Sequence, residues 1–178
     1  MSKFTGTVLA LDLATTTGWA FGKPGAKPTF GHITFAKPGS SRARIYRAFR
    51  TWLEDRWNVR DAQPDLIVFE SAALPMLMQG RTNADTIKAL IGLTEHLEEF
   101  CYQNIELREA SVQQVRAHFI GANIKSALAK PATVERCRQL KWMVETDDEA
   151  DALALLDYQL AYLRADLAYR TTPLFQGR

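Results

Sequence analysis

The apolar segment Thr7-Val8-Leu9-Ala10-Leu11-Asp12-Leu13 runs into Ala14-Thr15-Thr16-Thr17-Gly18 and then into Trp19-Ala20-Phe21-Gly22. The first part is typical of a strand that is buried on both faces. The small residues that follow predict a turn, and the next run predicts a second strand. A hydrophobic strand gains nothing from a buried charge, so Asp12 is the first candidate for a functional side chain.

The rest of the chain predicts an alternation of strands and helices. We expect strands over residues 29–35, 65–70 and 105–109, and helices over 41–57, 83–103, 111–119, 131–142 and 146–163. Residues 121–130 are predicted to be a linker, with Pro131 in the first turn of the helix that follows. This order predicts one α/β domain, a five-stranded mixed sheet flanked by helices over residues 1–165, and an irregular tail over 166–178.

The composition excludes several classes of protein. With 178 residues, 47% hydrophobic and 24% charged, the chain has ordinary globular usage. The uncharged runs are too short to span a membrane, and the first residues lack the apolar block of a signal peptide. Cys101 and Cys137 are predicted to be buried free thiols. We therefore expect a cytoplasmic protein with no membrane partner.

The charges are distributed unevenly although the net charge is only +2. Basic residues concentrate over 37–60 and 108–141, and acidic residues over 95–109 and 145–151. Taken alone, this composition favours solvated helix faces. The same pattern also suits a protein that binds a polyanion and holds a cation.

Four carboxylates stand at positions where chemistry is expected. Asp12 and Glu70 end predicted strands, and Asp148 and Asp151 share one face at the start of the last helix. Clustered acids raise one another's pKa unless a counter-charge is present, and hard divalent cations supply that charge. Singly, each acid has an ordinary explanation, because Glu70 can simply end a strand and Thr146-x-x-Glu149 forms a capping box.

The motifs that carry these acids resemble those of RuvC-type Holliday junction resolvases. The resemblance includes Leu9-Ala10-Leu11-Asp12-Leu13-Ala14-Thr15-Thr16-Thr17-Gly18, Ile67-Val68-Phe69-Glu70 and Asp148-Glu149-Ala150-Asp151-Ala152-Leu153. It covers nearly the whole chain, and its ending is most similar to phage or prophage-borne members. Ala14 stands where the family usually has glycine, and the segment after Glu70 lacks the aromatic residue found in some relatives.

The resemblance implies an RNase H-like fold, a homodimer, and paired nicking of four-way DNA junctions with Mg²⁺ or Mn²⁺, two ions per active site. Asp12, Glu70, Asp148 and Asp151 would be the metal ligands, with Asp12 bridging both ions. Lys130 resembles a family lysine near the scissile phosphate, and Lys125 is the alternative. The biological setting is left open between recombination or repair and the debranching of phage DNA.

Two further sets of residues are predicted to bind partners. The candidates for DNA contact are Arg42, Arg44, Arg47, Arg116, Lys125, Lys130, Arg136 and Arg138. The predicted helix over 83–103 carries more apolar surface than one-sided packing on a sheet needs. Its candidate dimer interface is Ile87, Leu90, Ile91 and Thr94. Burial of that stripe inside the monomer is the alternative.

Other functions share some of these features. An RNase H-like nuclease acting on flaps, branched DNA or RNA–DNA hybrids would have the same metal site. The Asp12-x-x-Thr15-Thr16-Thr17-Gly18 run also resembles the phosphate loop of actin-like kinases, but those enzymes duplicate the domain and are far longer. A non-catalytic junction-binding module would have no reason to keep four acids. The histidines show no triad spacing, and His32 and His96 are expected to be surface or satisfied polar residues.

Overall fold

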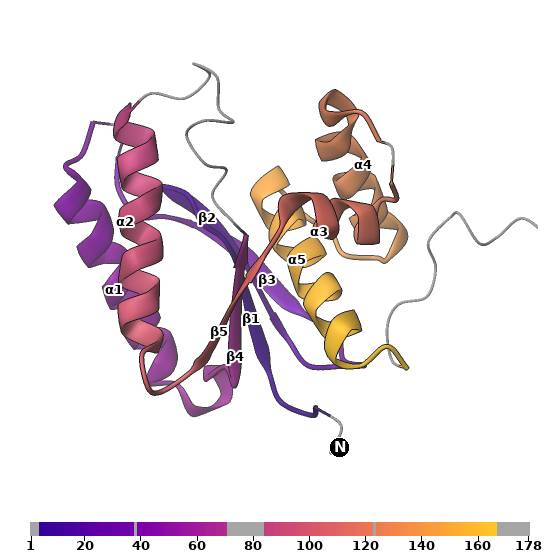
Figure 1. Cartoon of the computed structure of the whole chain (residues 1–178), viewed down its shortest axis with the longest axis horizontal. Coiled ribbons are helices and arrows are strands. Elements are labelled where there is room, and N and C mark those ends of the chain that lie inside the picture. The colour runs from indigo at the N-terminus through magenta and orange to yellow at the C-terminus, as the bar shows by residue number, and fades with distance from the viewer. Residues whose placement is uncertain (1–3, 38, 71–83, 123, 167–178) are drawn as a thin grey trace, which may run out of the picture.

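The computed structural model describes residues 4–37, 39–70, 84–122 and 124–166 of the chain. A five-stranded sheet separates two groups of helices, with α1 and α2 on one side and α3, α4 and α5 on the other (Figure 1). The strands are β1 (Val8–Asp12), β2 (Thr16–Gly22), β3 (Thr29–Thr34), β4 (Leu66–Glu70) and β5 (Glu106–Ala110). The helices are α1 (Arg42–Trp57), α2 (Ala84–Cys101), α3 (Val112–Phe119), α4 (Ser126–Gln139) and α5 (Asp147–Leu163), with a short 3₁₀ turn at Arg60–Ala62.

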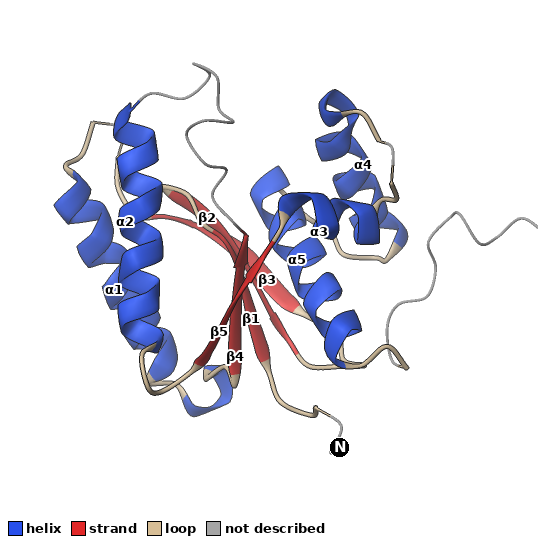
Figure 2. Cartoon of the chain, viewed as in Figure 1, coloured by secondary structure: helices blue, strands red, loops and turns tan. Residues whose placement is uncertain are grey.

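The sheet has the strand order β3-β2-β1-β4-β5. β1 pairs antiparallel with β2 and parallel with β4, and β5 continues the parallel part. The first three strands therefore form an antiparallel meander, and the rest is built from helical crossovers (Figure 2). The predicted five-stranded mixed sheet flanked by helices is confirmed, and so is the order of its elements.

Side chains alternate between two hydrophobic cores, one on each face of the sheet. On the α1 and α2 side, the strands contribute Leu9, Leu11, Ile67 and Phe69. On the α5 side, they contribute Val8, Ala10, Ala20, Leu66 and Val68. By this two-residue period, Asp12 follows Val8 and Ala10, and Glu70 follows Leu66 and Val68. Both acids therefore lie on the α5 face.

The predicted linker over residues 121–130 is wrong in its second half, because α4 already begins at Ser126. Pro131 lies inside this helix rather than in its first turn. Its fixed φ suits a helix, but at the sixth position its nitrogen cannot donate to the carbonyl of Ala127. The helix also ends earlier than expected, at Gln139 instead of residue 142.

The structure confirms the prediction for the two cysteines, whereas the predicted C-terminal tail stays untested. Cys101 and Cys137 are buried free thiols, as predicted. Within the described residues, no helix is both long enough and apolar enough to cross a membrane. The predicted tail over 166–178 lies almost wholly outside the described residues, so the domain division at residue 165 stays a prediction.

Candidate active site

Asp12 and Glu70 lie at the ends of adjacent parallel strands. β1 and β4 are paired up to Leu11 and Phe69, and the two acids occupy the next position on each strand. The carboxyl ends of parallel strands meet at one edge of a sheet, where sites of α/β proteins are found. The turn after Asp12 is fixed by Thr17, whose hydroxyl donates to the Ala14 carbonyl at 2.7 Å and accepts from the Ala14 N–H at 3.2 Å.

The first turn of α5 rests directly on this edge of the sheet. Gly18 is the β2 partner of Asp12, and a Cβ at Gly18 would lie 1.9 Å from the carbonyl oxygen of Asp148. Only a glycine leaves room for the helix backbone here. The helix begins with Thr146 as N-cap, whose side chain accepts from the Glu149 N–H at 3.2 Å. This contact brings the Asp148 backbone next to the strand pair that carries Asp12.

The electrostatics of Asp12 indicate an excess of negative charge. Its pKa is raised from 3.8 to about 7, first by burial and then by the carboxylates of Asp151, Glu70 and Asp148 in that order. The Lys130 ammonium opposes them. All four predicted ligands therefore belong to one electrostatic cluster around Asp12.

The other three acids respond to the same surroundings. Burial, and then Asp151, raise the pKa of Glu70 to about 7, and Arg116 on α3 opposes this shift. Burial also raises the pKa of Asp151, against the opposing charges of Lys130 and Arg116. The pKa of Asp148 is raised as well, first by burial. The two cations offset only part of the charge, and both were candidates from the sequence.

Lys130 reaches the site from α4, where its ammonium forms an ion pair with Asp147, the first residue of α5. This pair, led by its hydrogen bond, raises the pKa of Lys130 and lowers that of Asp147. The alternative lysine, Lys125, occupies the exposed N-cap position of α4. Only Lys130 contributes to the electrostatics of Asp12, which favours it over Lys125.

The pair formed by His32 and Glu149 was missed from the sequence. His32 Nδ1 donates to Glu149 Oε1 at 2.8 Å, and Glu149 Oε2 accepts from the Glu145 N–H at 2.7 Å. The hydrogen bond to Glu149 raises the pKa of His32. The capping box predicted a backward bond from Glu149, but nothing in the sequence placed His32 of β3 beside it.

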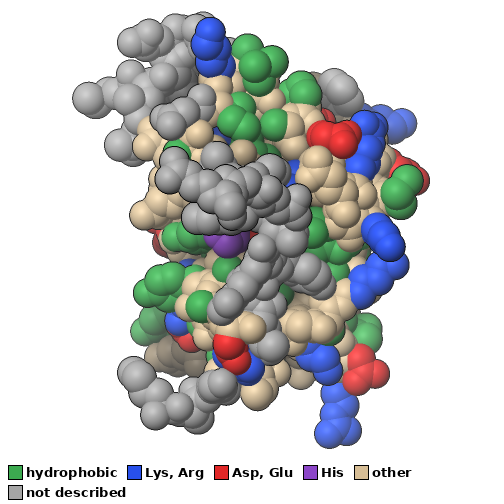
Figure 3. Space-filling model, turned by 90° about the vertical axis from the view of Figure 1, so that its right-hand side faces the viewer, with side chains coloured by type: hydrophobic (Ala, Val, Ile, Leu, Met, Phe, Trp, Pro, Cys, Tyr) green, Lys and Arg blue, Asp and Glu red, His purple; other side chains and the backbone are tan. Residues whose placement is uncertain are grey.

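The remaining basic candidates occupy different positions. Arg42, Arg44 and Arg47 are exposed on α1, and Arg138 is exposed on α4. Figure 3 looks onto the side that α3, α4 and α5 cover, where Lys and Arg side chains line one edge of the visible face. Arg136 differs from the others, because only 8% of it is exposed. A side chain so buried is poorly placed to meet a phosphate, and we leave it out of the proposed DNA contacts.

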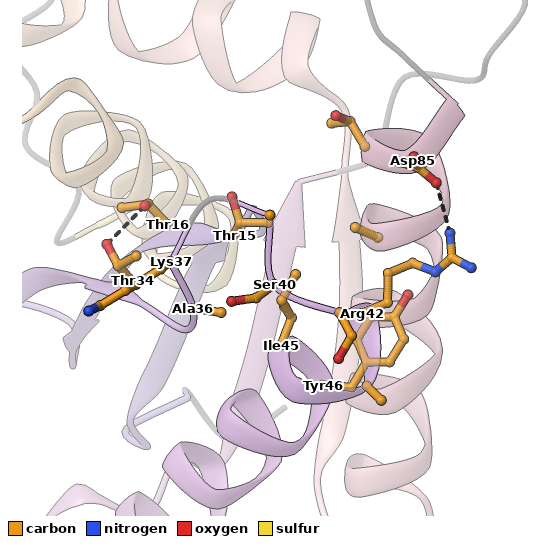
Figure 4. Close-up of a pocket in the computed structure, with 15 residues that line it drawn as sticks. Thr15, Thr16, Thr34, Ala36, Lys37, Ser40, Arg42, Ile45, Tyr46 and Asp85 are labelled. Atoms are coloured by element: carbon orange, nitrogen blue, oxygen red, sulfur yellow. Dashed lines mark hydrogen bonds and ion pairs between the residues drawn. The ribbon is translucent and has the colours of Figure 1, made fainter.

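A hollow of about 1020 Å³ lies near the acids but on the α1 and α2 side (Figure 4). Thr15 and Thr16, just after Asp12, line it together with Lys37 and Arg42. Arg42 pairs with Asp85 at 3.1 Å. None of the four predicted ligands lines this hollow. Because Thr16 begins β2 two residues before Gly18, which pairs with Asp12, the hollow lies at the same end of the sheet as the acids.

The predicted interface stripe on α2 is distinct from the face that packs inside the monomer. The helix buries Ala89, Gly92, Leu93, Leu97 and Cys101. Of the predicted stripe, Ile91 is 46% exposed, and Ile87, Leu90 and Thr94 are partly buried. Complete burial of the stripe inside the monomer, the alternative to a dimer, is therefore wrong.

The chemistry of the acids suits a divalent cation, since their oxygens are the donors that Mg²⁺ and Mn²⁺ accept. Their raised pKa values mark a charge excess that a bound cation would remove. As the described side chains stand, no three Asp, Glu, His or Cys groups are arranged to share one ion. The chemical type of these side chains therefore fits a divalent metal ion, but the carboxylates would have to move closer together to bind one.

Comparison with known proteins identifies the fold. No family model matches the sequence, and no curated protein matches it. Among solved structures, the chain is similar to Thermus thermophilus RuvC in complex with a Holliday junction substrate, with a TM-score of 0.69, 13% identity, and coverage of 92% of this chain and 98% of that one. It is also similar to the yeast mitochondrial Holliday junction resolvase Ydc2, with a TM-score of 0.59, 17% identity, and coverage of 92% and 80%.

A third similar structure is the fowlpox virus resolvase in complex with Holliday junction DNA. Its TM-score is 0.52 at 10% identity, over 90% of this chain and 99% of that one. The predicted RNase H-like fold of the RuvC type is thus confirmed over nearly the whole chain. At these sequence identities the similarity shows the fold alone, and the activity has to be argued from the residues of the site.

Proposed function

We propose that this chain is a RuvC-type resolvase, an endonuclease that is selective for four-way DNA junctions and depends on divalent metal ions. The observation that carries the proposal is the cluster formed by Asp12 and Glu70 with the first turn of α5. Burial and mutual repulsion raise the pKa of both strand acids to about 7. A chain that needed only stability would not gather such acids at the edge of a RuvC-type sheet.

The four acids have a defined role in this proposal. Asp12, Glu70, Asp148 and Asp151 would hold Mg²⁺ or Mn²⁺, two ions per active site. When bound, such ions supply the positive charge that stabilises the attacking and leaving oxygens of a phosphodiester. Lys130 stands beside the acids and meets the scissile phosphate, where its charge acts on the negative charge that develops during cleavage.

Binding of junction arms falls to the exposed basic residues. Arg44 and Arg47 on α1, with Arg138 on α4, are free of the active-site cluster and exposed to phosphates. Arg42, which lines the hollow, joins Arg44 and Arg47 on the α1 side of the sheet, whereas Arg138 lies on the opposite side. Contacts of this kind supply affinity without sequence information. Arg116 lies closer to Glu70 and Asp151, so we assign it to the phosphate nearest the acids.

The proposed enzyme acts as a homodimer on DNA in the cytoplasm of its host. A four-way junction needs two opposed nicks, and one chain carries one cluster of acids. An isologous pair of subunits would place two sites on equivalent strands. The stripe of Ile87, Leu90, Ile91 and Thr94, of which Ile91 is exposed and the others are partly buried, supplies the interface. Membership of a phage-borne group stays a prediction from the sequence of the last motif.

The test is cleavage of a labelled four-way junction, with a duplex of matched sequence and an RNA–DNA hybrid, each with and without Mg²⁺. We expect paired nicks in the junction, only with metal, and no cleavage by the Asp12→Asn protein. Equal or faster cleavage of the hybrid would assign the chain to another class of RNase H-like nuclease. Absence of metal-dependent cleavage on all three substrates would refute the proposal.

A further inference from the structure

The first turn of α5 carries three consecutive acids, Asp147, Asp148 and Glu149, and Asp151 follows at the start of the second turn. These acids differ in their surroundings. Asp148 and Asp151 contribute to the electrostatics of Asp12. Glu149 lies between them and has only 7% of its side chain exposed. A carboxylate this buried needs partners for both oxygens, and the structure supplies both.

Both oxygens of Glu149 are already occupied. Oε1 accepts from His32 Nδ1 at 2.8 Å, and Oε2 accepts from the Glu145 N–H at 2.7 Å. The backbone N–H of Glu149 donates to Thr146 Oγ1 at 3.2 Å. A metal could take an oxygen of Glu149 only by breaking one of these bonds. Glu149 is therefore suited to hold the turn in place rather than to ligate.

The partner His32 comes from the row of residues that runs under the same turn. Across the sheet, His32 pairs with Gly18, and Gly18 pairs with Asp12. The carbonyl of Asp148 rests on Gly18. Asp148 and Glu149 of α5 thus lie over a row of three paired residues, Asp12 on β1, Gly18 on β2 and His32 on β3. Asp148 contacts Gly18 in the middle of the row, and Glu149 binds His32 at one end.

We propose that Glu149, held by His32, is a positioning residue that fixes Asp148 over Gly18 so that it can bind metal together with Asp12. The proposal rests on the proposed function, since it assumes that Asp12 and Asp148 bind a divalent cation. Groups that hydrogen-bond around a metal site typically change its affinity by roughly 10–100-fold when they are removed. Loss of the Glu149 bonds releases the turn and weakens the metal site without removing a ligand.

The same helix provides a matched control. His118 Nε2 donates to Asp157 Oδ2 at 2.9 Å, and Asp157 has 8% of its side chain exposed. This second pair has nearly the same length and burial as the first, but it lies just over two turns further along α5. Removing Asp157 costs a comparable buried bond and leaves the first turn of the helix intact.

The experiment measures Mn²⁺ binding to the full chain without DNA, by electron paramagnetic resonance of free Mn²⁺. We expect Glu149→Ala to weaken binding about tenfold, Glu149→Gln to keep it within about twofold, and Asp157→Ala to leave it unchanged. A glutamine can still accept from the Glu145 N–H and donate to His32. His32→Leu, which removes one bond and keeps the bulk, is expected to weaken binding about threefold even if Glu149→Ala fails to fold.

Asp12→Asn separates the failure of this inference from failure of the proposed function. If Asp12→Asn weakens Mn²⁺ binding while Glu149→Ala and His32→Leu do not, the positioning role is refuted and the metal site stands. An equal loss of affinity in Asp157→Ala would also refute it, because general loosening of α5 would then explain the effect. If Asp12→Asn leaves Mn²⁺ binding unchanged, the metal site itself is wrong, and the inference falls with it.

Discussion

The two faces of the sheet are built from the same strands, but near the end of β1 they differ in the size of their side chains. Facing α1 and α2, β1 and β4 present bulky residues such as Leu11 and Phe69. Facing α5, β1 and β2 present Ala10 and Gly18, and the helix backbone comes into contact with the strand. Both faces carry a buried apolar core that stabilises the domain, but only on the α5 face do small residues beside Asp12 let a helix bring its acids to the strand ends.

The largest effect is expected on the α5 face, at Asp12. Asp12→Asn removes one carboxylate from the cluster and keeps the size of the side chain. We expect the single-turnover rate of junction cleavage to fall by roughly 10²–10³-fold or more, as for loss of one preorganised electrostatic group. Junction binding should be unchanged or tighter, because a charge that repels phosphate has gone. A rate near that of the wild-type protein would remove Asp12 from the active site.

The next effect tests the close approach of α5 to β2. Gly18→Ala would place a Cβ 1.9 Å from the Asp148 carbonyl oxygen, so the helix must move. We expect a loss of about 1–3 kcal/mol in the free energy of unfolding, together with weaker Mn²⁺ binding. Gly22→Ala is the control on the same strand, where the nearest atom is a flexible Leu156 methyl at 3.3 Å. Urea denaturation and metal titration that give the same result for both variants would contradict the argument.

Much of this division between the faces can be predicted from the sequence. The apolar runs within residues 7–13 and 65–70 predict two strands, and an acid at the end of each is visible as an exception to the apolar pattern. The capping box at Thr146 sets the start of α5 to the residue. The RuvC-type motifs then bring the acids together. These signals are local in the sequence, so they can be recognised without any knowledge of the fold.

Other features of the site depend on contacts that no local pattern records. His32 reaches Glu149 only because β3 pairs with β2 in one register and α5 lies over that row. The need for a glycine at position 18 likewise follows only from the contact with the Asp148 backbone in the folded structure. The start of α4 was missed because Lys125 is a poor N-cap and the apolar residues of the helix do not gather on one face.

A third prediction concerns the other face, where α2 carries the proposed dimer interface. Leu90→Glu places a charge in the partly exposed stripe, and we expect light scattering to show monomers that nick a junction but lose coordinated paired cleavage. Tyr102→Glu is the control, because Tyr102 is 71% exposed and lies just beyond the helix, outside the stripe. A wild-type protein that is monomeric both free and on the junction would refute the dimer.

The acids on the α5 face also predict how the stability of the protein depends on pH, which can be measured without DNA. Asp12 has an unfolded pKa near 3.8 and a folded pKa of about 7, and Glu70 shifts from 4.5 to about 7. Between these values the folded protein binds more protons than the unfolded chain, so the free energy of unfolding falls as pH rises from about 4 to about 7. Above pH 7 this contribution is constant.

We expect the metal-free protein to lose several kcal/mol, on the order of 4–8, across this range from the two acids together. The measurement is urea denaturation in EDTA at a series of pH values. Asp12→Asn, which cannot titrate, should flatten the curve, and Mn²⁺ should stabilise the wild-type protein most at the alkaline end. A wild-type curve as flat as that of the variant would mean that the cluster is more solvated than its burial indicates.

The smallest effect tests whether the α1 side has any part in DNA binding. Arg44 is exposed on α1, on the opposite side of the sheet from the acids. If it contacts one phosphate, Arg44→Gln should reduce the slope of log affinity against log salt by about 0.9 for duplex arms. Lys23→Gln is the control, because Lys23 is exposed just after Gly22, at the sheet edge opposite Asp12. Binding measured from about 50 to 200 mM salt should change for the first variant and not for the second. An unchanged slope for Arg44→Gln would remove Arg44 from the proposed DNA contacts.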